Sequence, residues 1–128
     1  MRVKIVILFF SVLFSFSSFA LASDQVQNRN QKALSAIDSV CGDTWCEGDY
    51  NYRFPRLKCN FRKQTCTLFY SAGLHPDEGQ EQKWTRSGTC KISAVRSYDD
   101  ILDSNTGNDL TASSYDQITE CLNGQERG

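Results

Sequence analysis

The chain has few of the residues from which catalytic and metal centres are built. It contains one histidine, His75, so no histidine pair is present to hold a metal ion. Neither a Cys-x-x-Cys pair nor a Gly-x-Ser-x-Gly motif occurs, which excludes the common zinc signatures and the nucleophile elbow of α/β-hydrolases. Beyond residue 22 no long apolar run follows, so we expect no membrane-spanning helix there. No residue set amounts to a catalytic signature or a cofactor site.

The first 22 residues have the pattern of a cleavable secretory signal. Arg2 and Lys4 precede an uncharged run over 5–19, and residues 20–22 (Ala-Leu-Ala) supply the small-x-small cleavage pattern. A membrane anchor is the alternative, but serines dilute the end of the apolar run. We therefore expect cleavage after Ala22, a secreted or periplasmic protein, and no membrane attachment after cleavage.

Removal of the signal leaves residues 23–128 as a single domain. These 106 of the 128 residues suffice for one domain and not for two. A core of this size gives a modest margin of stability. Loss of Arg2 and Lys4 leaves 12 Lys and Arg against 15 Asp and Glu, a net charge of −3.

The hydrophobic pattern of residues 23–128 predicts an α+β fold. Apolar residues recur at three- and four-residue steps over 23–41, which indicates a helix that Gly42 stops. Alternating runs predict a small antiparallel sheet of three or four strands, and Pro55 either ends the first or makes a bulge in it. The predicted strands cover 50–54, 57–61, 64–70 and 89–95, and residues 71–87 are predicted to form a loop. Two C-terminal helices are predicted to follow. The first begins at Ser97, and the second begins at Ser113 or Ser114 and ends at 123–124.

All six cysteines follow the signal, and an even number in an exported chain indicates three disulfides. Cys59 and Cys66 lie at equal distances from the centre of a predicted hairpin at Arg62 and Lys63. Antiparallel pairing would place these two cysteines opposite each other and within reach of a bridge. Arg-Lys is a poor two-residue turn, so we expect a hairpin loop of about four or five residues.

The predicted elements also suggest partners for the other four cysteines. Cys90 falls on a strand and Cys121 on the apolar face of the last helix, so a bridge between them would tie that helix to the sheet. Cys41 and Cys46 then remain as neighbours across a turn, although either could instead reach a strand. The sequence thus predicts a disulfide-stabilised fold.

Charge is distributed unevenly along the chain. No acid occurs over residues 51–76, whereas residues 97–128 carry seven acids and one arginine. Cations interleaved with aromatic residues on strands can bind a single-stranded nucleic acid or an acidic partner. The alternative is a sheet with an aromatic core face and a charged wet face, which the alternation over 50–54 favours. The net charge and the predicted export argue against nucleic acid. The candidate binding residues are Arg53, Arg56, Lys58, Arg62 and Lys63.

Three acids lie within seven residues in the turn after the first helix: Asp43, Glu47 and Asp49. Clustered oxygen ligands suit Ca²⁺, so this turn is a candidate calcium site. Glu47 and Asp49 could also act as a pair of catalytic carboxylates. The plain alternative is a solvated turn, because turns use Asp and Gly freely.

The sequence predicts an exported, non-catalytic binding domain that acts on an anionic or protein partner. One form of this function is inhibition of a secreted hydrolase. Two other classes remain open. One is a small secreted hydrolase that uses Glu47 and Asp49, and the other is a calcium-binding structural module.

Overall fold

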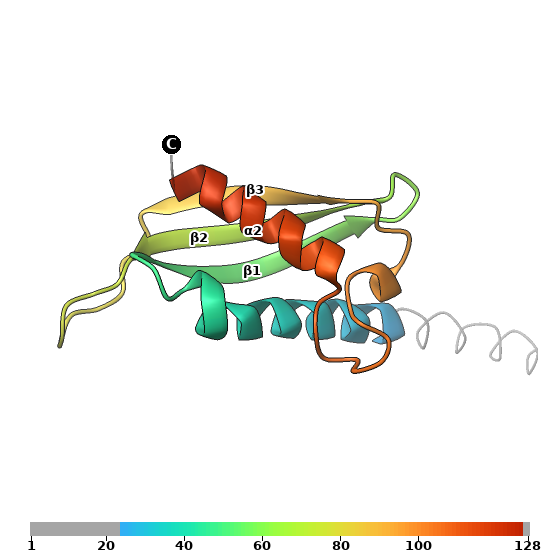
Figure 1. The fold of residues 1–128 in the computed structure, drawn as a ribbon, viewed down its shortest axis with the longest axis horizontal. Coiled ribbons are helices and arrows are strands. Elements are labelled where there is room, and N and C mark those ends of the chain that lie inside the picture. The colour runs from blue at the N-terminus through green and yellow to red at the C-terminus, as the bar shows by residue number, and fades with distance from the viewer. Residues whose placement is uncertain (1–23, 127–128) are drawn as a thin grey trace, which may run out of the picture. The chain divides into compact units, whose positions relative to one another are not determined.

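The computed structural model describes residues 24–126, and Figure 1 presents the fold. The chain divides into two compact units, residues 1–31 and 32–128. In the first unit, residues 24–31 are helical. The predicted signal over 1–22 and its cleavage site lie outside the described residues. Between residues 24 and 126, no helix is long and apolar enough to cross a membrane.

The second unit has the predicted α+β architecture. Helical residues 32–40 precede a sheet of three antiparallel strands in the order β1-β2-β3, and a helix follows it. Three disulfides hold these elements together. The elements are a π-helical turn η1 (Cys41–Trp45), β1 (Tyr50–Asn60), β2 (Thr65–Leu74), β3 (Arg86–Ser93), a 3-10 turn η2 (Tyr98–Asp100) and α2 (Ala112–Glu126).

β1 is one strand where the sequence pattern allowed two. Its register against β2 shifts between Arg53 and Arg56, so Pro55 sits in a bulge. Proline has no N–H for the ladder, and it is tolerated here because β1 lies at the edge of the sheet. The strand resumes its pairing at Arg56, so the sheet has three strands rather than four.

The hairpin between β1 and β2 has the predicted register. Cys59 pairs with Cys66, and their Cα atoms lie 4.0 Å apart. The backbone N–H of Gln64 donates to the Phe61 carbonyl at 3.2 Å, closing a four-residue turn over 61–64. Gln64 takes the positive φ of 56° that the turn requires, so Arg62 and Lys63 avoid it.

All three predicted disulfide pairings are confirmed. Besides Cys59–Cys66, Cys41 is bridged to Cys46, and Cys90 is bridged to Cys121. The bridge from Cys90 joins β3 to α2 across 31 residues of chain. All six cysteines lie among residues 24–126, and none of them is free.

The predicted helix ends were wrong at both helices. Gly42 does not stop the first helix, because the Cys46 N–H donates to the Cys41 carbonyl and closes the wider turn η1. α2 is capped by Thr111, whose hydroxyl accepts from the Ser114 N–H at 3.4 Å. The predicted cap Ser114 is buried instead, and it donates to the Asp100 carbonyl at 3.2 Å.

β2 ends later and β3 begins earlier than the alternation predicted, whereas β3 ends at Ser93 rather than at residue 95. Residues 71–74 continue β2, and β3 begins at 86, so the connecting loop covers 75–85 rather than 71–87. α2 continues past the predicted end at 123–124 to residue 126. These longer strands enlarge the sheet that carries the candidate site.

The core lies between one face of the sheet and the two helices. Trp45 is central to it, since its ring lies 5.9 Å from Phe54 of β1 and 5.8 Å from Tyr115 of α2. Its indole N–H donates to the Thr119 hydroxyl at 2.8 Å, so the buried nitrogen keeps a partner. The other buried apolar residues include Ala33, Ile37, Leu57, Leu68, Ile92, Ile118 and Leu122.

Candidate functional site

The sheet has a covered face and an open face. Leu57, Leu68 and Ile92 point to the covered face, where they are buried with the core residues of the helices. α2 crosses in front of this face in Figure 1, and the Cys90–Cys121 bridge fastens it there. Residues of the opposite parity form the other side, which we call the outer face.

Strand pairing arranges the outer face in rows across the sheet. Each row takes one residue from each strand, and adjacent residues in a row are Cα partners. Adjacent strands lie about 4.8 Å apart, so the two ends of a row are separated by about 10 Å. From the hairpin end, the rows are Lys58-Thr67-Lys91, Arg56-Phe69-Thr89 and Arg53-Ser71-Ser87.

Two arginines of the outer face stack on aromatic rings. The Arg53 guanidinium lies 4.8 Å from the centre of the Trp84 ring, and that of Arg56 lies 5.6 Å from the Phe69 ring. Both distances are in the range of cation–π attraction. Stacking limits the motion of the guanidinium while its N–H groups remain available at the edge of the plane. The two arginines are thus partly ordered for recognition of an anion.

The outer face is positively charged because the strands contain no acid. β1, β2 and β3 together hold five Lys and Arg and no Asp or Glu. Arg53, Arg56, Lys58 and Lys91 are all exposed. Among residues 24–126, no carboxylate forms a salt bridge with any of these four side chains; Arg96 pairs with Asp100 away from the sheet. Their charges are therefore available to a partner.

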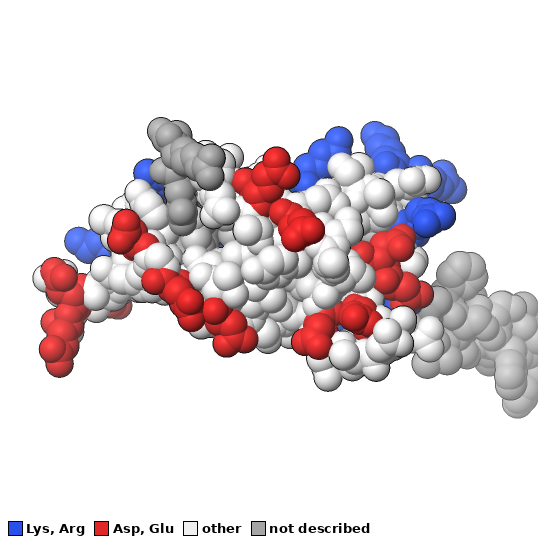
Figure 2. All heavy atoms as spheres, viewed as in Figure 1, with Lys and Arg blue, Asp and Glu red and all other residues white. Residues whose placement is uncertain are grey.

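The structure divides the five predicted binding residues between two places. Arg53, Arg56 and Lys58 share the outer face, whereas Arg62 and Lys63 are exposed in the hairpin turn beyond it. In Figure 2, viewed from the side of α2, acids are spread over the visible face, and most cations in view lie at the hairpin end, with others at the opposite end. The face on the side of α2 is thus mainly acidic.

Sequence reasoning missed Lys91 of β3 as a member of this group. Lys91 is exposed and alternates along β3 with the buried Cys90 and Ile92. Its place in the row of Lys58 depends on the register of β2 with β3, which no local pattern specifies.

Both edges of the sheet are partly closed by side chains. Gln117 of α2 accepts from the Ser93 N–H at 2.7 Å and donates to the Ser93 carbonyl at 3.1 Å, as a neighbouring strand would. On the other edge, the Tyr52 N–H lies 3.3 Å from the sulfur of Cys46. Strand addition is disfavoured where these groups are already occupied. The outer face is the broad surface that the strands leave open.

The acidic turn does not form a cation site in the structure. Asp43, Glu47 and Asp49 are all exposed. Within residues 24–126, no group of three or more His, Cys, Asp and Glu side chains is placed to hold a metal ion. The Asp49 carbonyl accepts from the His75 N–H at 3.2 Å, so this part of the turn has a structural contact with the end of β2.

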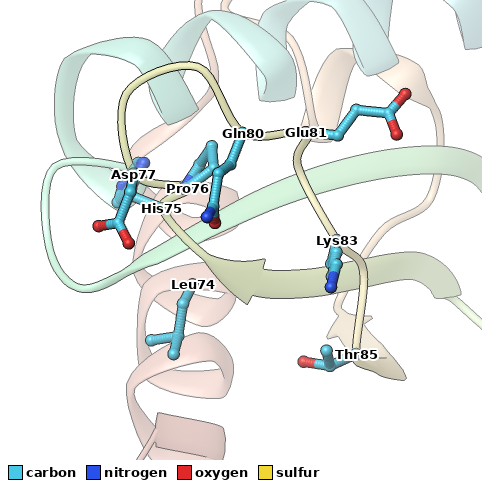
Figure 3. A pocket seen from close by; sticks show the side chains of 8 residues that line it. All are labelled: Leu74, His75, Pro76, Asp77, Gln80, Glu81, Lys83 and Thr85. Atoms are coloured by element: carbon cyan, nitrogen blue, oxygen red, sulfur yellow. The ribbon is translucent and has the colours of Figure 1, made fainter.

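A pocket of about 280 Å³ lies within the 75–85 loop (Figure 3). It is lined by His75, Asp77, Glu81 and Lys83, among others, but by neither Glu47 nor Asp49. The His75 Nε2 is 2.7 Å from the Cys46 carbonyl, so the ring is already hydrogen-bonded to the backbone. In Figure 3 the Glu81 carboxylate points away from His75 and Asp77. The pocket therefore does not bring together the carboxylates of the hydrolase hypothesis.

Comparison with known proteins adds no assignment. No family model, curated protein or solved structure matches the chain.

Proposed function

We propose that this protein is a small disulfide-bonded binding domain that takes an anionic partner on its outer face. The carrying observation is that four exposed cations share this face, while the strands contain no carboxylate. Cations held on a rigid sheet attract and orient a partner of opposite charge. Arg62 and Lys63 extend the same charge to the hairpin end.

The test is a binding measurement against dextran sulfate, a strong polyanion, with charge-matched variants. Lys58 and Lys91 flank Thr67 in one row, and replacing both by Ser removes two positive charges from the outer face. Each lost ion contact at high dielectric is worth about 1 kcal/mol. The double variant should therefore bind about 30-fold more weakly.

The control replaces Lys32 and Arg96 by Ser, which changes the net charge equally. Lys32 lies on the first helix and Arg96 follows β3, so neither belongs to the outer face. We expect the control to bind as the native protein does, and added salt to weaken binding of both. Equal losses in the two double variants would mean that net charge alone drives the association, and the proposal would fail.

We also propose that the protein acts after export, with the signal removed. Three disulfides are compatible with an oxidising compartment, where such bridges persist. Mass spectrometry of protein from the producing cell should find Ser23 as the first residue and no free thiol. An intact Met1 on a membrane-bound chain would contradict export with cleavage.

A further inference from the structure

We infer that the anionic partner is an acidic polysaccharide, a sugar chain that carries carboxylate or sulfate groups. This inference rests on the proposed binding function of the outer face and identifies the chemistry of its ligand. Three features of the face support it, namely its unpaired hydroxyls, its lack of apolar contact area and the spacing of its cations.

Two positions beside the cations carry hydroxyl groups. Thr67 lies between Lys58 and Lys91, and Thr89 lies in the row of Arg56. Neither hydroxyl forms a hydrogen bond with another residue of the described chain. A threonine hydroxyl both donates and accepts, as a sugar hydroxyl does. The face thus offers hydroxyl groups for a polyhydroxylated backbone close to the cations that would bind its acids.

Apolar side chains are nearly absent from the outer face. Phe69 is half-buried beneath the Arg56 guanidinium, and the half-buried Trp84 ring is in contact with Arg53. A protein interface usually has an aromatic or aliphatic centre, and a membrane-binding face has apolar residues to insert. Stacking of bases in a single-stranded nucleic acid needs free aromatic faces. The composition therefore favours a polar polymer over these partners.

The backbone positions of the cations are spread over a width that suits a chain of anionic groups. Lys58 and Lys91 stand about 10 Å apart across the sheet, and Arg56 lies about 7 Å along β1 from Lys58. The cations thus cover an area wide enough for several anionic groups at once. A polymer with an acid on successive sugars can place one anionic group at each cation.

The test compares polygalacturonate, poly-L-glutamate of equal charge number and neutral dextran as ligands of the full chain, purified after export with its disulfides. We expect polygalacturonate to bind at least about tenfold more tightly than poly-L-glutamate. Dextran should bind more weakly than either polyanion.

Thr67→Val keeps the size and charge of the site but removes its central hydroxyl. This variant should weaken polygalacturonate binding about fivefold, the value of one hydrogen bond, and leave poly-L-glutamate unchanged. Thr44→Val, at an exposed position of η1 outside the strands, serves as the control.

Two results separate the inference from the proposal beneath it. If poly-L-glutamate binds as tightly as polygalacturonate, and Thr67→Val affects both equally, the sugar assignment is wrong while anion binding stands. If neither polymer nor dextran sulfate binds, anion binding by the outer face is wrong and the polysaccharide assignment falls with it.

Discussion

The Cys90–Cys121 bridge is expected to contribute most to stability among the three disulfides. It closes 31 residues of chain, whereas Cys59–Cys66 closes seven. In the chain-entropy model, cross-links over these lengths stabilise by about 3.7 and about 2.4 kcal/mol, because the longer loop removes more conformations from the unfolded state. The Cys90 bridge also fastens α2 over the core, where Ile118 and Leu122 are buried.

The assay is thermal and urea unfolding of two double variants. Replacing Cys90 and Cys121 by Ala should cost about 1.3 kcal/mol more than replacing Cys59 and Cys66 by Ala. For a domain of this size, that difference corresponds to about 5–10 °C in Tm. Equal losses, or a greater loss from the Cys59–Cys66 pair, would refute the argument from loop length. The Cys59–Cys66 bridge would then stabilise more of the protein than the hairpin turn that it closes.

Two further perturbations probe the frame that supports the outer face. A Cβ added at Gly73 would overlap the backbone carbonyl of Lys83, so Gly73→Ala should lower the free energy of unfolding by about 1–3 kcal/mol and alter Trp84 fluorescence. Gly42→Ala is the control, because a Cβ at Gly42 meets open space. Similar losses for the two variants in urea unfolding would contradict this reasoning. Burial raises the pKa of Tyr70, although the Arg86 charge lowers it in part. As pH rises, the unfolded chain therefore loses the Tyr70 proton before the folded protein does, so stability should fall as pH rises above about 10. Tyr70→Phe should flatten this dependence of stability on pH. An unchanged slope of stability against pH would show that Tyr70 is not its source.

The hairpin and its disulfide could be predicted because their signals are local. Alternation on both sides of Arg62 and Lys63 placed Cys59 and Cys66 on one face at equal distances from the turn. A period of two fixes the face of every residue once the turn is located. Alternation likewise placed Cys90 on a strand, and the apolar positions around Ile118 and Leu122 placed Cys121 on the apolar face of the last helix.

The end of the first helix could not be predicted from its own residues. Gly42 is a common stop signal, yet the chain continues helically to Trp45. Trp45 is held by Phe54 and by the hydroxyl of Thr119, which is 74 residues away in sequence. These distant contacts outweigh the local preference of one glycine, which is about 1 kcal/mol.

The candidate site was only partly visible in the sequence for a related reason. The absence of acids over 51–76 identified the cations of β1 and of the turn. This charge pattern can be read from the sequence alone, without knowing how the strands pair. Trp84 and Lys91 join Arg53 and Lys58 only through the return of the 75–85 loop and the pairing of β3. Both depend on contacts between residues far apart in the chain.

The most direct test of the account is to map where a polyanion contacts the folded protein. Backbone NMR shifts of the isotope-labelled, disulfide-bonded chain would be followed during titration with polygalacturonate at low salt. We predict that the largest changes occur at Arg56, Lys58, Thr67 and Lys91, with smaller ones in the hairpin turn and none along α2. Changes centred on α2 or on the 75–85 loop, with the outer face unaffected, would contradict the central claim that the open side of the sheet is the binding surface.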